Sequence, residues 1–238
     1  MSGTNARLLA NVMAEYRKIG RNSTIGEYWK YVTEDDLWSE LCLCVLSSNV
    51  PFESASSAFQ HLKRKGLLTK EYLLSNSEAI RTLSKELSKP LYLPIRKNGD
   101  LRKYRFPQIR ATYIVKAART IYKSGYSLKA LLQESKSEYD ARDVLTKRVP
   151  GVGLKQASLF LRNIGYSRSL AIIDTHIISF LEKFERPCES RITQPHSKEE
   201  YENIEKMMQT FARKLNAELS LLDFAIWSVM KSSNWRNK

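Results

Sequence analysis

The chain has 238 residues, 42% of them hydrophobic and 27% charged, a composition typical of a folded globular protein. Lysine and arginine number 39 against 25 acidic residues, so the net charge is +14 and the isoelectric point about 9.7. The longest apolar run, residues 41–46, is too short to cross a bilayer, and the amino terminus lacks the apolar core of a secretory signal. We therefore expect an intracellular protein that stays out of membranes and binds a polyanion. Nucleic acid is the first candidate, although charge alone does not exclude an anionic membrane surface.

The positive charge is concentrated in one part of the chain. Residues 96–119 hold eight basic residues against one acid, Asp100, which is +7 of the net +14. This basic window is the expected electrostatic contact with nucleic acid, and a solvated basic loop and helix face is the alternative. Its members are Arg96, Lys97, Arg102, Lys103, Arg105, Arg110, Lys116 and Arg119.

Helical patterns dominate the chain, and strand signals are scarce. We expect an all-α protein of about ten helices, at residues 5–19, 34–47, 51–65, 76–87, 107–124, 137–148, 154–164, 174–184, 197–216 and 219–231. Thr33 followed by three acids is a helix start, and Ile109, Tyr113, Ala117 and Ile121 predict one helix face. The loop 88–106, rich in Pro, Lys and Arg, is an exposed insertion able to form a hairpin. Cys42, Cys44 and Cys188 have no metal-ligand spacing, and the first two are expected to be buried.

Residues 149–153, Val-Pro-Gly-Val-Gly, form a turn between two expected helices, a helix-hairpin-helix element. Gly151 and Gly153 can take backbone angles that are closed to other residues, and they leave their amides uncovered. These amides and the following helix N-terminus can hold a DNA phosphate whatever the base sequence. A plain connecting turn is the alternative. On the other side of the turn, a monovalent cation can bind the carbonyls of Lys147, Val149 and Val152.

Lys155 falls in the first turn of the second helix of this element. The positive end of the helix dipole disfavours an ammonium group there, and partial burial acts in the same direction. Both effects leave more free amine at neutral pH, as a lysine nucleophile requires. A phosphate contact is the alternative.

Asp174 follows nineteen residues after Lys155, in the sequence Ile-Asp-Thr-His. Its carboxylate can cap the helix that starts at Thr175, and it can also face a positively charged sugar in a transition state. Capping alone is the alternative. His176 can donate to a phosphate, or it can be an ordinary surface or core histidine.

Gly-Val-Gly-Leu-Lys at 151–155 with Ile-Asp-Thr-His at 173–176 resembles the helix-hairpin-helix DNA glycosylase superfamily, which includes endonuclease III and 8-oxoguanine DNA glycosylase. Residues 105–106, 109–114 and 157–166 are similar to the 8-oxoguanine branch, in particular its compact archaeal type. Leu-Ser-Ser-Asn at 46–49 resembles the helix-end motif that enters the duplex, and the tail from Leu222 also fits. The four-cysteine iron–sulfur cluster of endonuclease III cannot form, because only Cys188 lies beyond the middle of the chain.

The resemblance implies a role for each matching residue. Lys155 is the nucleophile and Asp174 its carboxylate partner. Asn49 fills the gap left by the extruded base and touches the orphaned partner together with Arg110; a helix C-cap and a phosphate contact are the respective alternatives. Trp227 and Lys238 are candidates for recognising the damaged base, and an aromatic core residue is the alternative for Trp227.

The resemblance also implies a fold and an activity. We expect two lobes with a basic cleft between them: residues 32–168 as a helical barrel that carries the hairpin, and residues 1–31 with 169–238 as the second lobe. The expected activity is that of a bifunctional DNA N-glycosylase and AP lyase that excises 8-oxoguanine from double-stranded DNA, as a monomer and without a metal or organic cofactor. Two alternatives stay open: a glycosylase for oxidised pyrimidines, and a DNA-binding module without catalysis.

Overall fold

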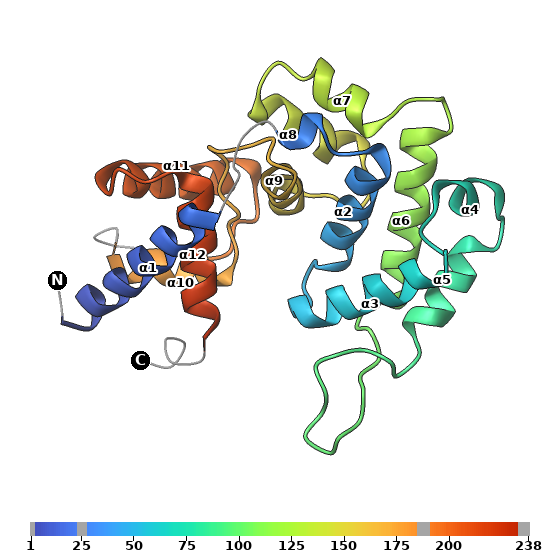
Figure 1. Cartoon of the computed structure of the whole chain (residues 1–238), viewed down its shortest axis with the longest axis horizontal. Coiled ribbons are helices and arrows are strands. Elements are labelled where there is room, and N and C mark those ends of the chain that lie inside the picture. Colours follow the sequence, from blue (N-terminus) through green and yellow to red (C-terminus); the bar gives the residue numbers. More distant parts are fainter. Residues whose placement is uncertain (1–2, 23–27, 185–190, 233–238) are drawn as a thin grey trace. The chain divides into compact units, whose positions relative to one another are not determined.

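The computed structural model describes residues 3–22, 28–184 and 191–232, and within them the chain folds into twelve α-helices and one 3-10 turn at Tyr28–Lys30 (Figure 1). No β-strand occurs in these ranges, so the all-α prediction is confirmed. The helices are α1 (Gly3–Asn22), α2 (Glu34–Leu46), α3 (Phe52–Arg64), α4 (Lys70–Ser75), α5 (Ala79–Leu87), α6 (Pro107–Tyr122), α7 (Leu128–Glu134), α8 (Glu138–Arg148), α9 (Leu154–Asn163), α10 (Thr175–Phe184), α11 (Lys198–Lys214) and α12 (Leu219–Lys231).

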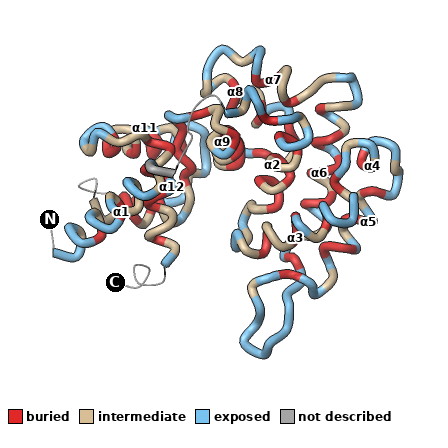
Figure 2. The backbone as a smooth tube through the Cα atoms, in the orientation of Figure 1, coloured by how far each residue is buried: buried red, intermediate tan, exposed pale blue. Residues whose placement is uncertain are grey.

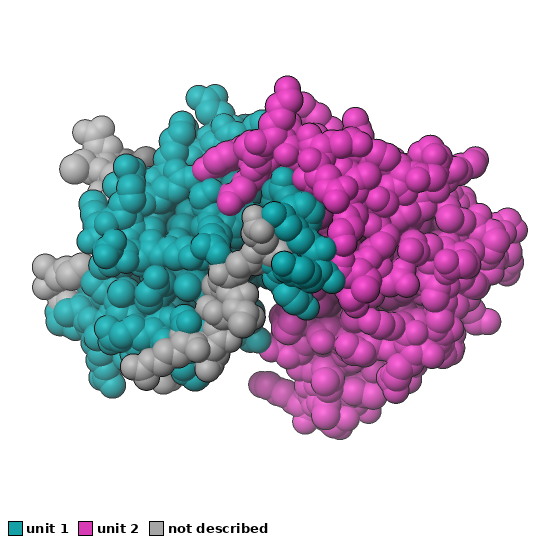
Figure 3. Space-filling model, turned by 45° about the horizontal axis from the view of Figure 1, so that its top comes forward, with its two compact units in different colours: residues 1–31, 161–238 teal, residues 32–160 magenta. Residues whose placement is uncertain are grey.

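The chain forms two compact units, coloured separately in Figure 3. Unit 2 is residues 32–160, and unit 1 combines residues 1–31 with residues 161–238. The boundary between the units falls after Phe160, inside α9. The sequence instead led us to expect it after residue 168. Contacts of the last turn of α9 explain the difference, since Arg162 forms an ion pair of 2.8 Å with Asp223 of α12.

Helix α6 lies in the core of unit 2, where it packs against α2, α4 and α5. Its buried face is formed by Ala111, Ile114, Ala118 and Ile121, all at most 3% exposed. The predicted face is therefore wrong in its first turn, because Ile109 is 50% exposed. The neighbouring Arg110 is buried in its place, since its guanidinium group turns inward toward the end of α2.

Two short helices, α4 and α7, were not expected from the sequence. Helices of six and seven residues span fewer than two turns, too few for a periodic pattern to be recognised. Each depends instead on a capped N-terminus: Thr69 Oγ1 accepts from Tyr72 N, and Ser127 Oγ accepts from Ala130 N. Glu34 adds a second cap to α7 by accepting from the amides of residues 128 and 129 at 2.8 and 3.0 Å.

The insertion 88–106 forms the hairpin that the sequence suggested. Tyr92 and Arg102 form an isolated antiparallel pair, with reciprocal backbone hydrogen bonds of 2.9 and 2.8 Å. Tyr92 is fully buried at the base of the hairpin, whereas every residue from 95 to 103 is exposed, as Figure 2 shows in pale blue. Half of the basic window therefore projects into solvent on a loop that leads directly into α6.

Unit 1 is built around α12, which packs against α1, α10 and α11. Phe180 of α10 and Phe211 of α11 meet edge-to-face with ring centroids 5.3 Å apart. The hydroxyl of Tyr16 on α1 accepts a hydrogen bond of 3.0 Å from Glu218 N at the start of α12. Both free cysteines of the described residues, Cys42 and Cys44, are buried in unit 2 as expected.

One buried acid, Glu86, links α5 to the end of α3 through basic side chains. Its carboxylate lies 2.9 Å from His61 Nε2, 3.0 Å from Lys65 Nζ and 2.7 Å from Lys89 Nζ. Burial by itself raises the pKa of Glu86, but hydrogen bonds from Lys89, His61 and Lys65 outweigh it and lower the pKa to about 2. The ionised carboxylate therefore stabilises the folded state.

This cluster predicts how stability depends on pH. The folded pKa of Glu86 lies below its ordinary value of 4.5, so its contribution is present above that pH and is lost as the pH falls toward 2. We expect Glu86→Gln to lower the free energy of unfolding by about 2–3 kcal/mol at pH 7, and by much less at pH 3. Urea unfolding at both pH values measures this difference. The control is Glu78→Gln, whose carboxylate is 63% exposed and pairs with Arg81, and which should cost under about 1 kcal/mol.

Candidate functional site

The helix-hairpin-helix turn connects α8 to α9 and is held from within by two valines. Val149 and Val152 are 2% and 4% exposed, and Val152 N donates to Val149 O at 3.1 Å. The carbonyl of Gly153 accepts the first helical hydrogen bond of α9, from Ala157 N at 2.9 Å. The turn is thus a rigid link that determines where α9 begins.

Gly151 is the position in this turn that no other residue can occupy without strain. Its φ is +83°, in the left-handed region that favours glycine. A Cβ added here would lie 2.5 Å from Tyr113 Cγ and 2.7 Å from Tyr113 Cβ, far inside van der Waals contact. The helical periodicity places Tyr113 only on a helix face, and no local signal in the sequence indicates that it packs against the turn.

Gly153 does not use the special backbone angles that the sequence analysis allowed for both glycines. Its φ lies outside the left-handed region, and an added Cβ would meet only Gln156 Oε1, at 3.8 Å. The residue is exposed at the start of α9. Nothing in the described structure therefore requires glycine here, and the phosphate contact of this residue at the helix N-terminus stays a prediction.

Lys155 is the second residue of α9 and is half-buried. Among the described residues of unit 2, no acidic side chain forms an ion pair with it. The predicted cation site at the carbonyls of Lys147, Val149 and Val152 stays a prediction, and the Val149 carbonyl already accepts one hydrogen bond within the turn. No cluster of three or more His, Cys, Asp or Glu side chains suited to a metal occurs in the described part of the chain.

Asp174 caps α10 with only one of its carboxylate oxygens. Oδ1 accepts from His176 N at 2.8 Å and from Ile177 N at 2.9 Å. The side chain is half-buried, and Oδ2 takes part in neither bond. Capping therefore leaves an oxygen for a second role. Asp174 and Lys155 belong to different units, so their partnership stays a prediction, as does a phosphate contact by the half-buried His176.

Asn49 is exposed just after α2 and has a φ of +59°, a conformation that asparagine tolerates better than most residues. Arg110 lies behind it: Nη2 donates to Ser48 O at 2.8 Å, and the residue is only 7% exposed. The guanidinium group also lies close to Tyr104; burial raises the pKa of Tyr104 to about 12, although the arginine opposes this shift. The structure gives Arg110 a part in shaping the Asn49 loop, and contact of either residue with DNA stays a prediction.

Trp227 lies half-buried on α12, beside an aromatic residue that the sequence analysis missed. Its ring stacks on Phe224, with centroids 5.8 Å apart and planes 15° apart, and Lys231 Nζ lies 4.8 Å from the Trp227 ring centroid. Phe224 is 40% exposed. The sequence did carry a signal for this pair, because two aromatic residues three positions apart on one helix lie on the same face. Lys238, the other predicted base-recognition residue, lies outside the described residues.

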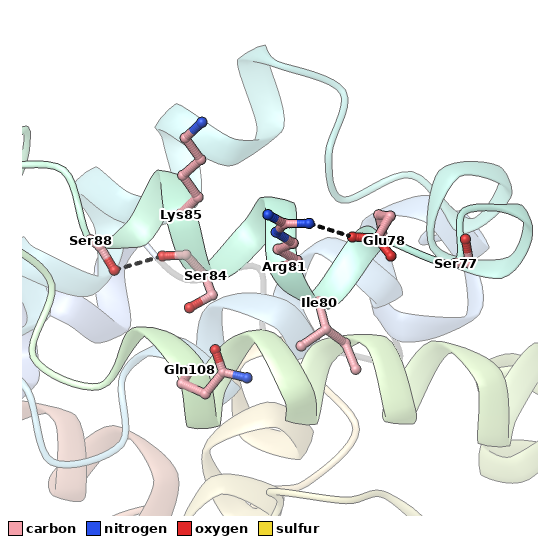
Figure 4. Close-up of a pocket in the computed structure, with 8 residues that line it drawn as sticks. All are labelled: Ser77, Glu78, Ile80, Arg81, Ser84, Lys85, Ser88 and Gln108. Carbon is pink, nitrogen blue, oxygen red and sulfur yellow. Dashed lines mark hydrogen bonds and ion pairs between the residues drawn. The ribbon is translucent and has the colours of Figure 1, made fainter.

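An open groove lies along α5 in unit 2 (Figure 4). Arg81 on its surface pairs with Glu78 at 3.5 Å, and the remaining lining consists of three serines, Ile80, Lys85 and Gln108 of α6. None of the predicted site residues lines it.

The sequence of this chain matches a known protein family. The family model described as 8-oxoguanine DNA glycosylase matches residues 20–217. The chain belongs to this family. A member from Saccharolobus solfataricus, named 8-oxoguanine DNA glycosylase/AP lyase, is 33% identical over 198 residues, covering 82% of this chain and 83% of the relative. The member of that name from Methanocaldococcus jannaschii is 29% identical over 199 residues, with coverage of 84% and 82%.

Solved structures agree with this membership. The crystal structure of the 8-oxoguanine DNA glycosylase from Methanocaldococcus jannaschii superimposes with a TM-score of 0.71 at 28% identity, covering 98% of this chain and 95% of that one. A second structure of that enzyme, in complex with a 15-mer DNA containing 8-oxoguanine, gives a TM-score of 0.67 at 25% identity, with coverage of 98% and 93%. The predicted family and helical fold are confirmed. No described helix has the length and apolar character needed to span a bilayer.

The two glycines of the turn predict different mutant behaviour. Gly151→Ala should lower the free energy of unfolding by about 2–4 kcal/mol, because it combines a left-handed φ with a clash against Tyr113. Gly153→Ala should cost under about 1 kcal/mol and yet raise the Kd for duplex DNA at least about threefold, because a methyl group hinders approach to the amides. Urea unfolding and fluorescence anisotropy measure the two effects. Equal stability of the two variants would contradict this account of the turn.

Proposed function

We propose that the protein is a bifunctional DNA N-glycosylase and AP lyase that excises 8-oxoguanine from double-stranded DNA in base excision repair. Membership in the family is the observation that carries this proposal, because relatives at about 30% identity are named 8-oxoguanine DNA glycosylase/AP lyase. The related structure with DNA containing 8-oxoguanine supports the same substrate. The helix-hairpin-helix turn, Lys155 and Asp174 supply the groups that this chemistry needs.

Unit 2 has two features suited to holding DNA by its backbone. The exposed Gly153 lies where the free amides of α9 begin, which favours a phosphate. The hairpin adds exposed cations, including Arg96, Lys97 and Lys103. Both contacts ignore base sequence, as an enzyme that must search undamaged DNA for rare lesions requires.

A base stacked inside the duplex is out of reach of a side-chain nucleophile, so the nucleotide must be flipped out. Asn49 is suited to occupying the vacated position, because it is exposed on a loop that Arg110 holds from behind. Trp227 and Phe224 offer aromatic surfaces for stacking on α12.

Lys155 then acts as the nucleophile. The lone pair of its neutral amine attacks C1′ of the deoxyribose, and the bond from C1′ to the base breaks with its electron pair going to the base, which takes up a proton. Loss of a proton from nitrogen and opening of the sugar ring produce a Schiff base. Removal of a C2′ proton then expels the 3′ phosphate by β-elimination, and water releases Lys155. Asp174 stabilises the positive charge at C1′ through its carboxylate.

The proposal includes a monomer that acts inside the cell. One chain contains both Lys155 and Asp174, so no second copy is needed to complete the catalytic pair. All groups named in this chemistry are amino-acid side chains or backbone amides, and the proposal involves no metal or organic cofactor. The two alternatives from the sequence, an enzyme for oxidised pyrimidines and a binding module without catalysis, differ in observable products.

The covalent intermediate provides the direct test. Borohydride should trap wild-type protein on a duplex containing 8-oxoguanine, and should trap it far less on one containing thymine glycol. Lys155→Gln should give no trapped complex while binding DNA within about threefold of wild type. Asp174→Asn should slow single-turnover excision by about a hundredfold or more without loss of stability, because asparagine caps a helix almost as well as aspartate.

Each alternative has its own result in this experiment. A stronger trapped complex on thymine glycol supports the oxidised-pyrimidine enzyme. No complex with wild type on any damaged duplex supports the binding module, and trapping by Lys155→Gln excludes Lys155 as the nucleophile.

The salt dependence of binding tests the contribution of the hairpin. Replacing Arg96, Lys97 and Lys103 by glutamine should reduce the slope of log Kd against log salt by about 2–3, because about 0.9 counterion is released per phosphate contact. The matched control removes three exposed charges from α11 (Lys206, Arg213 and Lys214), and its slope should fall by less than about 1. Equal changes in both triple variants would mean that net charge alone, and not the hairpin, determines binding.

A further inference from the structure

The segment that leads from α9 to Asp174 is held in unit 1 by polar side chains. Residues 170–174 have no regular secondary structure, and Leu170, Ala171, Ile172 and Ile173 are at most 5% exposed. Buried backbone amides outside helices and strands need other partners, because leaving one unpaired costs about 1–3 kcal/mol. The chain supplies these partners from two helices distant in sequence, α11 and α12.

Three consecutive amides immediately before Asp174 each bind one side chain. Glu205 Oε1 accepts from Ala171 N at 2.9 Å, Asp223 Oδ2 from Ile172 N at 2.7 Å, and the Tyr201 hydroxyl from Ile173 N at 3.2 Å. The same hydroxyl donates to Ala171 O at 2.8 Å. We call Tyr201, Glu205 and Asp223 the anchor residues; they are 4%, 2% and 1% exposed.

Asp223 is the most informative of the anchor residues. Its second oxygen, Oδ1, accepts from Arg162 Nη1 at 2.8 Å, so the carboxylate links the end of α9 to the segment. Burial raises the pKa of Asp223 to about 7, Arg162 and the Ile172 amide oppose this shift, and the negative charge of Asp174 adds to it. An ionised acid at this position is therefore costly to the fold.

A purely structural explanation requires only neutral acceptors at these amides. The chain instead uses two buried acids and a tyrosine at three successive positions, and the next residue is the aspartate whose Oδ1 is fixed by two further amides. Buried polar groups that destabilise the fold are typical of active sites, because there they hold a reactive group in a fixed position.

We propose that Tyr201, Glu205 and Asp223 are positioning residues that fix the backbone before Asp174 and so aim its free carboxylate oxygen at the reacting sugar. This inference rests on the proposed catalytic role of Asp174. A displacement of about 1 Å in a catalytic group can cost on the order of a hundredfold in rate, so loosening one anchor should affect the chemical step more than the binding of DNA.

Tyr201→Phe is the most conservative test, because it keeps the ring and removes only the hydroxyl that bonds Ile173 N and Ala171 O. We expect single-turnover excision of 8-oxoguanine to slow by about tenfold or more, with the Kd for the same duplex changed by less than about threefold. Asp223→Asn should behave alike, because its NH2 group replaces one of the two carboxylate oxygens and cannot accept from the donor, Arg162 Nη1 or Ile172 N, that faces it.

Tyr16→Phe is the matched control within unit 1. This substitution also removes a tyrosine hydroxyl that accepts a hydrogen bond from a backbone amide. The amide here is Glu218 N at the start of α12, which is not part of the segment before Asp174. The melting temperature of this variant should fall by no more than that of Tyr201→Phe, because it loses one backbone hydrogen bond and not two, while its excision rate should stay within about twofold of wild type. Rates are compared at a temperature where thermal unfolding shows all variants fully folded.

Two outcomes overturn the inference. One is an unchanged excision rate in both Tyr201→Phe and Asp223→Asn while Asp174→Asn is slow, which leaves the proposed function intact and makes the anchor residues purely structural. The other is an equal loss of rate in Tyr16→Phe and Tyr201→Phe, which assigns the effect to stability. If Asp174→Asn itself excises 8-oxoguanine at the wild-type rate, the proposed role of Asp174 fails first, and that result is distinct from both.

Discussion

The close contact between Gly151 and Tyr113 is the constraint on which the candidate site depends. Only a residue without a Cβ allows the turn to pack directly on the Tyr113 side chain of α6. Together with the buried Val149 and Val152, this contact fixes where α9 starts. The amides near Gly153 and the amine of Lys155 then lie on a rigid element, which catalysis and anion binding both need because neither tolerates a loosely held group.

Polar contacts fix the backbone beside candidate site residues in irregular segments, where helix packing does not. Arg110 bonds the carbonyl next to Asn49 and supports an exposed loop whose backbone has a positive φ. In unit 1, side chains of α11 and α12 bond the irregular segment before Asp174. In both places a buried charged group holds the backbone beside a residue with a proposed role at the DNA. Buried polar groups thus occur where the position of the backbone beside a candidate site residue must be fixed.

Much of the fold could be predicted because its long helices carry local signals. The Thr33 cap bonds Asp36 N as its sequence indicates, and Asp174 begins a helix as expected. The signals weaken where helices are short, as in α7, which depends on Glu34 from a distant part of the chain. They also mislead at Ile109, because periodicity identifies apolar positions and cannot show that a buried arginine takes their place.

The sequence by itself located the groups of the candidate site: a glycine turn, a lysine one residue into a helix and an aspartate at the start of another. These depend on bonds between residues at most four apart, which local patterns record. Only the tertiary structure decided that Gly151 is required by the fold, whereas a Cβ at Gly153 would meet only Gln156 Oε1, at 3.8 Å. It also decided that Arg110 lies buried behind Asn49 and that Asp223 holds the segment before Asp174. Such contacts join residues far apart in the chain. Because the packing of whole helices brings these residues together, no local sequence pattern can indicate the contacts.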